Sequence, residues 1–354
     1  MAPRPQLEFP IQPNLARCLG VFFYSQFFRT PAYPTSSFAG QTVIVTGSNT
    51  GLGLEAARHF YRLGAAQLVL AVRTVSKGHA AKEDIVRSVP SRTDAGSIEV
   101  WQLDHASTAS TIAFAERVKT ELRRVDVAVL NAGVNNPTFQ LSEGYEQTTQ
   151  VNVLNTFLLA LMLLPRLNES KTNLPDSTPH LTVVSSEAHR LTRFEEINAP
   201  DLYAKLNDEK GYSQQPRYQV SKLLEVLLVR ELVARLQSST TGGASAGPPP
   251  VIINLVNPGL CTSTLGVRDA QPPLVVRIVR RILDRTTEVG ARTFVLAASA
   301  PAASHGEFQS DGKTQDVEAW IYTDVGQNAQ RKVWEQTVRV LEERRPGVLS
   351  EIGL

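Results

Sequence analysis

The stretch TGSNTGLG, residues 46–53, lies between the apolar run Thr42–Thr46 and a helical pattern at Leu54–Leu63. A strand, a glycine-rich turn and a helix in this order are typical of the first unit of a nucleotide-binding α/β domain. Further along the chain, short runs rich in Val, Ile and Leu alternate with longer helical patterns. Most of these runs are near-continuous in apolar residues, which indicates strands buried on both faces of a parallel sheet. The sequence therefore predicts a doubly wound α/β fold.

This pattern predicts one domain at residues 41–330, with a mostly parallel, seven-stranded Rossmann sheet and helices on both of its faces. An N-terminal extension (1–40) precedes it, and a C-terminal helix or tail (331–354) follows it. The predicted strands are Thr42–Thr46, Leu68–Val72, Ile98–Leu103, Val125–Leu130, Leu181–Ser185, Val251–Val256 and, more weakly, Ala319–Thr323. The predicted helices include Leu54–Leu63, Thr108–Arg123, Glu143–Leu167 and Arg217–Gln237.

The composition is ordinary for a soluble globular protein, with 42% hydrophobic and 20% charged residues among 354. A formal net charge of only +2 gives no indication of nucleic acid or of an acidic partner. The two cysteines, Cys18 and Cys261, form no C-x-x-C pair and no metal-ligand spacing. No metal site is therefore expected, and a reducing, cytoplasmic location is the default.

An aromatic-rich run near the N-terminus, Leu19–Phe28, is far shorter than the ~20 apolar residues that a membrane span needs. No clearly basic region precedes it, so a secretory signal is not expected. The favoured interpretation is a helix that lies on the domain, and the alternative is an interfacial membrane anchor.

The glycines Gly47, Gly51 and Gly53 let the backbone turn tightly and approach a pyrophosphate, which the N–H groups of the following helix would face. Their G-x-x-x-G-x-G spacing differs from the commonest dinucleotide fingerprint, and a purely structural turn is the alternative. Arg73 follows the second strand, Lys77 lies one helical turn on, and no acid stands at this point. Because an arginine there can accept a 2′-phosphate, the sequence predicts NADPH over NADH; a solvated surface arginine is the alternative.

Two further strand ends carry residues suited to a nucleotide. Asp104 closes the third strand and can accept a hydrogen bond from the adenine amino group, or cap the helix that begins near Ser107. Asn131-Ala132-Gly133 closes the fourth strand, where small residues let the backbone pass close to a ribose. The alternative for this stretch is a plain strand-to-loop turn.

Tyr218 and Lys222 stand four residues apart in RYQVSK, so they share one face of the predicted helix Arg217–Gln237. Free tyrosine has a pKa of about 10, and a neighbouring ammonium is expected to lower it. Such a tyrosine can donate a proton to a nascent alkoxide or accept one from an alcohol. Because Y-x-x-x-K is common by chance, a surface helix pair is the alternative.

Ser185 and Ser186 end the fifth predicted strand, and a hydroxyl there would hold the substrate oxygen beside the tyrosine. Ser186 is the better placed of the two, with Ser185 as the second choice; caps of the following segment are the alternative role. Asn152 lies in an otherwise apolar helix, where it would bind a water that links Lys222 to solvent or satisfy a backbone carbonyl at a kink. Asn155 is a weaker candidate.

These motifs resemble the short-chain dehydrogenase/reductase family in identity and order, over about residues 41–300. The glycine loop, Asn131-Ala132-Gly133, the strand-end serines, Y-x-x-x-K and the later Asn257-Pro258-Gly259 carry the resemblance. The stretches TGSNTGLG, LAVR and VSSEAH are similar to the retinol-dehydrogenase-like branch and to fungal secondary-metabolism reductases. The separation of Ser186 and Tyr218 exceeds that of many members, which makes the substrate mouth unusual.

The resemblance implies a catalytic tetrad, which is Asn152, Ser186, Tyr218 and Lys222. It also implies that Lys222 bonds the nicotinamide ribose and that Leu52, Asp104 and Asn131 line the cofactor site. Ser263 stands where relatives often carry a threonine that contacts the nicotinamide amide. The full predicted NADP(H) set is Gly47, Gly51, Leu52, Gly53, Arg73, Lys77, Asp104, Asn131, Tyr218, Lys222 and Ser263.

Two long stretches, 187–216 and 260–289, are expected to form the walls and lid of the substrate pocket. The second contains LVVRIVRRIL, which predicts a lid helix or, alternatively, a helix that contacts a membrane. Apolar residues in this stretch favour an apolar substrate; they include Leu260, Leu265, Leu274 and Val275.

The expected function is an NADP(H)-dependent oxidoreductase that moves a hydride between nicotinamide and an apolar ketone, aldehyde or alcohol of polyketide or terpenoid metabolism. One alternative is a non-catalytic NADP-binding regulatory protein, and another is a dehydratase or epimerase on the same scaffold. The expected partner is a small apolar substrate and no nucleic acid. Peripheral membrane contact and a homo-oligomer are both left open.

Overall fold

The computed structural model describes residues 7–92, 97–240, 248–262, 265 and 283–354. Its centre is a sheet in the order β10-β9-β8-β7-β4-β1-β2-β3, which confirms the doubly wound α/β fold. All neighbouring strands in this order pair in parallel, except β10, which pairs antiparallel with β9. The strands are β1 Thr42–Thr46, β2 Gln67–Val72, β3 Ile98–Gln102, β4 Val127–Leu130, β7 His180–Val184, β8 Ile252–Asn257, β9 Phe308–Ser310 and β10 Lys313–Thr314.

The edge of the sheet beyond β8 differs from the prediction. Ala319–Tyr322, predicted as part of a strand, is a 3-10 turn, η7. The edge position belongs instead to β9, whose Phe308 pairs with Leu255 of β8. With β10 the sheet has eight strands rather than seven. A three-residue strand is too short to form a recognisable apolar run, so it could not be read from periodicity.

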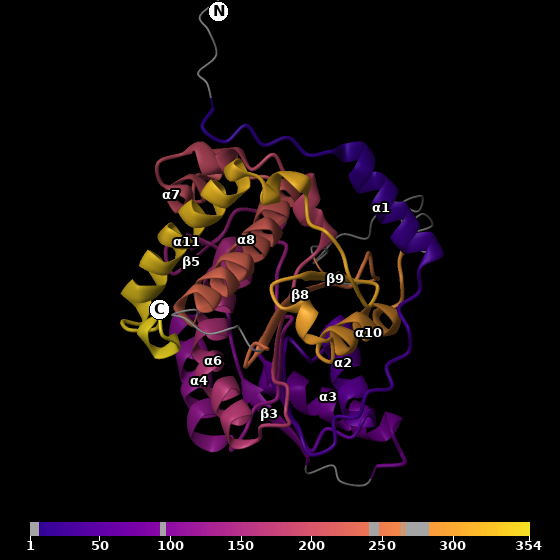
Figure 1. The fold of residues 1–354 in the computed structure, drawn as a ribbon. Helices are drawn as coiled ribbons and strands as arrows, with labels where there is room; N and C mark the ends of the chain where they lie inside the picture. Colours follow the sequence, from indigo (N-terminus) through magenta and orange to yellow (C-terminus); the bar gives the residue numbers. More distant parts are fainter. Residues whose placement is uncertain (1–6, 93–96, 241–247, 263–264, 266–282) are drawn as a thin grey trace, which may run out of the picture.

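Helices cover both faces of the sheet (Figure 1). On one face lie α2 Gly51–Arg62, α3 Val75–Ser88 and α10 Thr287–Ala297, and on the other lie α4 Thr108–Glu121, α6 Thr156–Asn173 and α8 Gln214–Thr240. The C-terminal helix α11, Asp324–Arg344, packs on α8 and begins before the predicted boundary at residue 331. This arrangement leaves the carboxyl ends of the parallel strands to hold the site.

The strands are apolar throughout because the sheet is buried on both sides. In β1, Ile44 belongs to the core under α4, α6 and α8, whereas Val43 and Val45 belong to the core under α2, α3 and α10. All five residues of β1 are buried. Alternate side chains therefore serve opposite layers, as expected for a central parallel strand.

The predicted helix Glu143–Leu167 begins and ends later than expected. A small hairpin, β5 Leu141–Ser142 and β6 Tyr145–Glu146, comes first. Short α5, Gln147–Thr149, and a π-helical turn η2, Gln150–Asn155, then lead into α6. The continuous stretch Gln147–Asn173 has the length and hydropathy of a membrane-crossing helix, yet 83% of its apolar window is buried in the fold. It is a core helix by position.

The stretch 187–216, one of the two predicted pocket walls, folds into short helical turns. It consists of η3 Glu187–Leu191, η4 Glu195–Asn198, α7 Leu202–Leu206 and η5 Glu209–Gly211. Several of its side chains belong to the core, namely Phe194, Ile197, Leu202, Tyr203 and Leu206. The Tyr203 hydroxyl also hydrogen-bonds Thr337 of α11 at 2.7 Å. Part of this stretch therefore packs on α11, and its place at the substrate pocket stays a prediction. Most of the other predicted wall, including Leu274 and Val275, lies outside the described residues.

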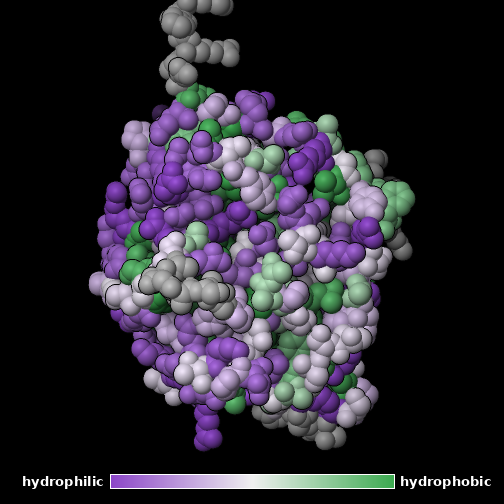
Figure 2. Space-filling model, viewed as in Figure 1, coloured by the Kyte–Doolittle hydropathy of each residue, from purple (hydrophilic) through white to green (hydrophobic). Residues whose placement is uncertain are grey.

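The N-terminal helix α1, Leu15–Phe28, lies on the domain. The Cys18 thiol donates to the carbonyl oxygen of Arg190 at 3.5 Å, and Gln26 Nε2 donates to that of Leu260 at 2.8 Å. The outer face keeps large apolar side chains exposed, namely Leu15, Leu19, Phe23, Tyr24, Phe27 and Phe28. Figure 2 shows hydrophobic atoms gathered over this helix at the right-hand edge. Membrane contact through this face was the alternative interpretation, and nothing in the structure tests it.

Candidate active site

The predicted functional residues gather along one edge of the sheet, where parallel strands end. Gly47 follows β1, Asn131 follows β4, and Ser185 and Ser186 follow β7. The ends of β1 and β4 are hydrogen-bonded neighbours, as are those of β4 and β7. The order of the strands reverses on the two sides of β1, and this is where doubly wound sheets bind ligands.

The glycine loop is tied to the end of β4 by Thr46 and Asn131. Thr46 Oγ1 accepts hydrogen bonds from the backbone N–H groups of Asn131 and Ala132, both at 2.9 Å. Asn131 Nδ2 donates back to the Thr46 carbonyl oxygen at 2.9 Å. Gly47 has a φ of 65°, and a Cβ added to Gly53 would collide with the Gly47 carbonyl oxygen. The loop therefore requires glycine at these positions to pack this closely.

The start of α2 has the properties of a phosphate site. Thr50 occupies the N-cap position but makes no side-chain hydrogen bond to the first turn. Gly51 has a φ of 59° and open space where a side chain would lie. The buried hydroxyl of Ser48 has no hydrogen-bond partner among the residues that the structure describes. Free helix N–H groups, open space and a spare hydroxyl together fit an anionic group.

Two cations stand at the end of β2. Arg73 and Lys77 are both exposed, and neither forms an ion pair within the described part of the chain. Leu52, another residue of the predicted cofactor set, is partly buried against α10. A Cβ added to Gly290 of that helix would come within 2.8 Å of Leu52 Cδ2. Because Arg73 and Lys77 are exposed and form no ion pair with the described residues, both are available to a phosphate.

Asp104 does not cap α4. Its Oδ1 accepts the backbone N–H of Ala106 at 3.0 Å, which closes a local turn. The cap of α4 is Ser107, whose hydroxyl accepts the N–H of Ser110 at 3.3 Å. The contact of Asp104 with an adenine stays a prediction.

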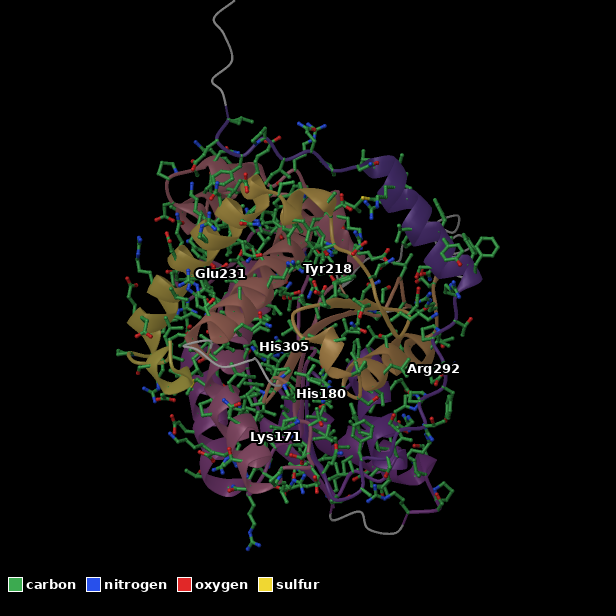
Figure 3. The ribbon with its side chains drawn as sticks, in the orientation of Figure 1. Lys171, His180, Tyr218, Glu231, Arg292 and His305 are labelled. Carbon is green, nitrogen blue, oxygen red and sulfur yellow. The ribbon has the colours of Figure 1, made fainter. Side chains whose placement is uncertain are left out.

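Helix α8 carries the proton-transfer residues on one face. Lys222 Nζ lies 5.7 Å from the centre of the Tyr218 ring, one turn along the helix. The Ser186 hydroxyl, at the end of β7, lies close enough to the Tyr218 phenol to lower its pKa. Figure 3 places Tyr218 near the middle of the molecule, above the sheet. The structure thus brings together three members of the predicted tetrad.

The pKa of the Tyr218 phenol is raised, whereas the sequence predicted a lowered pKa. Burial raises its pKa above the ordinary value of 10.0, and the Lys222 ammonium lowers it only in part. The Glu225 carboxylate raises the pKa further, and the nearby Ser186 hydroxyl lowers it. The sequence shows the neighbouring lysine but not the loss of water around the phenol, which outweighs it.

Lys222 is buried in an ion pair. Its Nζ donates to Glu225 Oε1 at 2.8 Å and to the Val184 carbonyl oxygen at 2.9 Å. Burial lowers the pKa of Lys222, but Glu225 and Tyr218 together raise it above its ordinary value. The amine is therefore an ammonium at neutral pH.

The two serines have different surroundings. The Ser185 hydroxyl is buried and donates to the Lys222 carbonyl oxygen at 3.1 Å, so it fixes the backbone of α8. The Ser186 hydroxyl accepts the N–H of Ala188 at 3.1 Å, and it also lowers the pKa of the nearby Tyr218 phenol. Ser186 is the serine that shares the reaction face with the tyrosine.

Asn152 lies in the π-helical turn η2 and is buried. Its Oδ1 accepts the N–H of Val134 at 2.8 Å, and its Nδ2 donates to the carbonyl oxygen of the same residue at 2.9 Å. A third bond joins Nδ2 to the Ser221 hydroxyl at 3.1 Å. The side chain thus ties the π-helical turn to the backbone of Val134, beyond the end of β4, and its link through water to Lys222 stays a prediction. Asn155 bonds His105 and Arg344, away from Lys222.

The end of β8 completes the edge. Asn257 Oδ1 accepts the N–H groups of Gly259 and Glu187, at 3.2 and 3.3 Å, and so links this turn to the start of η3. Gly259 adopts a φ of 79°. The predicted cofactor residue Ser263 lies outside the described residues.

Comparison with known proteins identifies the chain. The family model for short chain dehydrogenase matches residues 41–174. The short chain dehydrogenase/reductase dmxR8 of Cryptosporiopsis sp. is 41% identical over 333 residues, which cover 93% of this chain and 99% of that protein. The chain belongs to the short-chain dehydrogenase family. The short chain dehydrogenase atnD of Emericella nidulans is 42% identical, covering 83% of this chain and 90% of its own.

Solved structures of short-chain dehydrogenases share the fold. One from Escherichia coli CFT073, complexed with NADPH, has a TM-score of 0.55 at 20% identity and covers 78% of this chain and 99% of its own. Another from Shigella flexneri 2a, complexed with NADP, has a TM-score of 0.53 at 19% identity and covers 79% of this chain and all of its own.

Two residues of this short-chain dehydrogenase were missed in the sequence. Thr46 holds the glycine loop, and its hydroxyl at a strand end gave no distinct signal. Glu225 binds Lys222, and it was visible as an acid among apolar residues in SKLLEVLLV. A carboxylate at i+3 from a buried lysine was the available signal.

Proposed function

We propose that this chain is an NADP(H)-dependent oxidoreductase acting on a carbonyl or the corresponding alcohol. The observation that carries the proposal is the cluster of Ser186, Tyr218 and Lys222 beside the glycine loop at one sheet edge. A phenol with a hydroxyl on one side and an ammonium on the other suits proton exchange with a substrate oxygen.

The residues present fit a dinucleotide. The uncapped start of α2 with Gly51 and Ser48 would take the phosphates. Arg73 and Lys77 would take a 2′-phosphate, which supports NADP(H) over NAD(H). Two solved relatives in fold were determined with NADPH and NADP, which also supports this choice. When bound, the cofactor supplies or accepts the hydride.

The remaining chemistry belongs to side chains of this chain. In the reductive direction Tyr218 donates its phenolic proton to the substrate oxygen, and Ser186 holds that oxygen by a hydrogen bond. Lys222 stabilises the phenolate that is left and is itself held by the Val184 carbonyl oxygen. Asn152 fixes the turn η2 against the end of β4. Oxidation uses the same groups in reverse.

The substrate is proposed to be an apolar ketone, aldehyde or alcohol. Leu260 and Leu265, which follow β8, are exposed apolar residues on the expected mouth of the site. The resemblance to secondary-metabolism reductases supports a polyketide or terpenoid substrate. A screen of apolar carbonyls with NADPH, followed by cofactor absorbance, tests this; net NADPH consumption also separates a reductase from a regulatory protein, a dehydratase or an epimerase.

The decisive test is Tyr218→Phe. The variant keeps the ring and loses the proton, so turnover of an accepted carbonyl should fall by roughly 10²- to 10⁴-fold. NADPH binding, measured by fluorescence titration, should stay close to that of the wild type. Turnover that survives the substitution would contradict the assigned role.

A further inference from the structure

The argument starts from Glu225, a buried carboxylate that the proposed chemistry does not use. It lies on the same face of α8 as Tyr218 and Lys222, at positions i, i+4 and i+7. Its Oε1 accepts the Lys222 ammonium at 2.8 Å. Among the described residues, Lys222 and Glu225 are the charged groups that shift the pKa of the phenol; η2 carries no charged side chain, and in η3, which also packs on α8, the charges of Glu187 and Arg190 act on each other.

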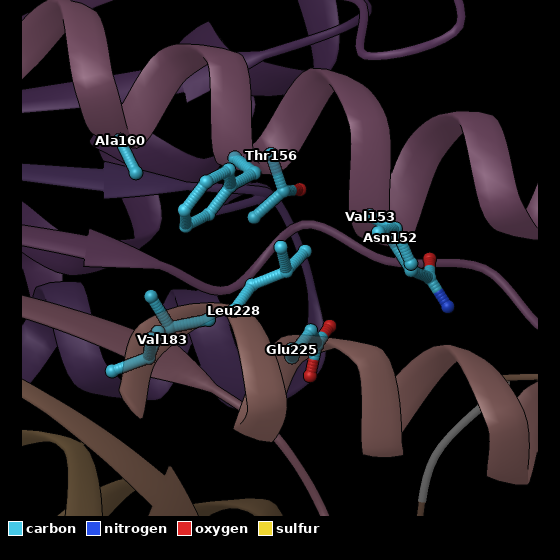
Figure 4. Close-up of a pocket in the computed structure, with 9 residues that line it drawn as sticks. Asn152, Val153, Thr156, Ala160, Val183, Glu225 and Leu228 are labelled. Carbon is cyan, nitrogen blue, oxygen red and sulfur yellow. The ribbon is translucent and has the colours of Figure 1, made fainter. Parts of the chain in front are cut away.

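The second carboxylate oxygen of Glu225, Oε2, lacks a hydrogen-bond partner among the described residues although it is buried. The Ser185 hydroxyl, which donates to the Lys222 carbonyl oxygen at 3.1 Å, lies close enough to Glu225 to lower the pKa of its carboxyl. Glu225 also lines a small cavity of about 10 Å³, roughly the space of one water, which also borders Asn152 and Thr156 (Figure 4).

A half-satisfied buried carboxylate is costly as a purely structural element. Removing a carboxylate from water is unfavourable unless it is paired and fully hydrogen-bonded. Glu225 has one strong partner, the ammonium of Lys222, and burial raises the pKa of Glu225 to about 7 against the opposing effects of Lys222 and Ser185. The contact with Lys222, which itself lies beside the Tyr218 ring, is the route by which Glu225 can act on the tyrosine.

An unpaired ammonium beside a phenol favours the phenolate, which is the form needed to accept a proton from an alcohol. Carbonyl reduction needs the phenol, which must still hold the proton that it donates. We propose that Glu225 is a positioning residue that pairs with Lys222 and keeps Tyr218 protonated through and above neutral pH, which adapts the site to carbonyl reduction. This inference rests on the proposed function for its kinetic readout.

The test is the pH profile of Glu225→Gln. Glutamine keeps an oxygen that accepts from Lys222 but carries no charge. The alkaline limb of kcat/KM for carbonyl reduction should move to lower pH by about 1 unit, at the low end of what a nearby charge does. Glu225→Asp, which keeps the charge, should lie closer to the wild type. An unmoved limb, or one that moves to higher pH, would overturn the inference.

A matched control lies on the same helix. Glu231 is also buried and paired, with Arg235 at 2.8 Å, but it faces α11, where Gln330 binds it. Figure 3 labels it well apart from Tyr218. Glu231→Gln should leave the profile unchanged. A shift equal to that of Glu225→Gln would show that any lost charge on α8 has the same effect, and it would overturn the inference.

A second measurement does not depend on turnover. Phenolate absorbance in the ultraviolet, taken as the difference between each protein and its Tyr218→Phe counterpart, reports the ionisation of this phenol directly. The midpoint should be lower in Glu225→Gln than in the wild type. If no carbonyl is turned over, the proposed function fails while this titration still decides the role of Glu225; equal midpoints would contradict it.

Discussion

The two ends of the candidate active site differ in the kinds of groups that form them. The phosphate end consists of backbone and small residues, with Gly47 and Gly53 in direct contact and its cations at the surface. The proton-transfer end buries Lys222 and Glu225 beside Tyr218. Charges interact strongly where water is excluded and weakly where it is present. Substitutions should therefore act through shape at the first end, and through charge and pH at the second.

The largest effect is expected for Lys222→Met. Methionine fills the space of the lysine but leaves the Glu225 carboxylate buried and unpaired, which costs about 3–5 kcal/mol of folding free energy. Burial already raises the pKa of Glu225 from 4.5 to about 7, and the loss of Lys222 raises it further. Because the folded state then binds the proton more tightly than the unfolded state, stability is lost as pH rises through this range.

Urea unfolding on either side of the Glu225 pKa, at about pH 6 and about pH 8, measures this effect. The destabilisation should be greater at the higher pH. The double variant Lys222→Met with Glu225→Gln removes the unpaired charge and should recover part of the loss at the higher pH. A destabilisation that is equal at both pH values would show that lost packing, not charge, dominates this end.

At the phosphate end, Gly53→Ala should have a smaller effect that does not depend on pH. A Cβ there would collide with the carbonyl oxygen of Gly47, and backbone cannot move away as a flexible side chain would. Overpacking of this kind costs about 1–3 kcal/mol. Thermal unfolding with and without NADPH should show a lower melting temperature and a smaller shift on adding the cofactor.

Gly51→Ala is the matched control for Gly53→Ala. It has open space for a Cβ but a φ of 59°, so about 1 kcal/mol of backbone strain is expected without a collision. If it destabilises the protein as much as Gly53→Ala, the close packing of the loop on α2 is not what requires glycine at position 53.

Features that depend on neighbours in sequence were predicted, and features that depend on long-range packing were missed. β1, the glycine loop and the Tyr218–Lys222 pair depend on neighbours in sequence, and all lie where they were expected. β9 was missed because it becomes a strand only by pairing with β8. The packed state of residues 187–216 was missed for a similar reason, since its apolar residues meet α11 only in the fold.

At the site itself, the identities of the residues could be predicted but their electrostatic state could not. The i+4 lysine predicts a lower pKa for Tyr218, whereas burial and Glu225 produce a higher one. The choice between Ser185 and Ser186 also required coordinates, because adjacent residues at a strand end point in different directions. The sequence identifies the residues of such a cluster, but the burial of each side chain, which shifts its pKa, depends on the fold.

The smallest effect is expected for Arg73→Asp, because the side chain is exposed. A charge-assisted hydrogen bond to a 2′-phosphate contributes about 1.5–3 kcal/mol, and solvent screening favours the lower value, so the preference for NADPH over NADH should fall roughly tenfold. The ratio of kcat/KM with the two cofactors measures it. Arg87→Asp makes the same charge reversal at the far end of α3 and should leave the ratio unchanged. A wild type that already prefers NADH would remove the role of Arg73, while the shape-dependent effects at Gly53 would stand.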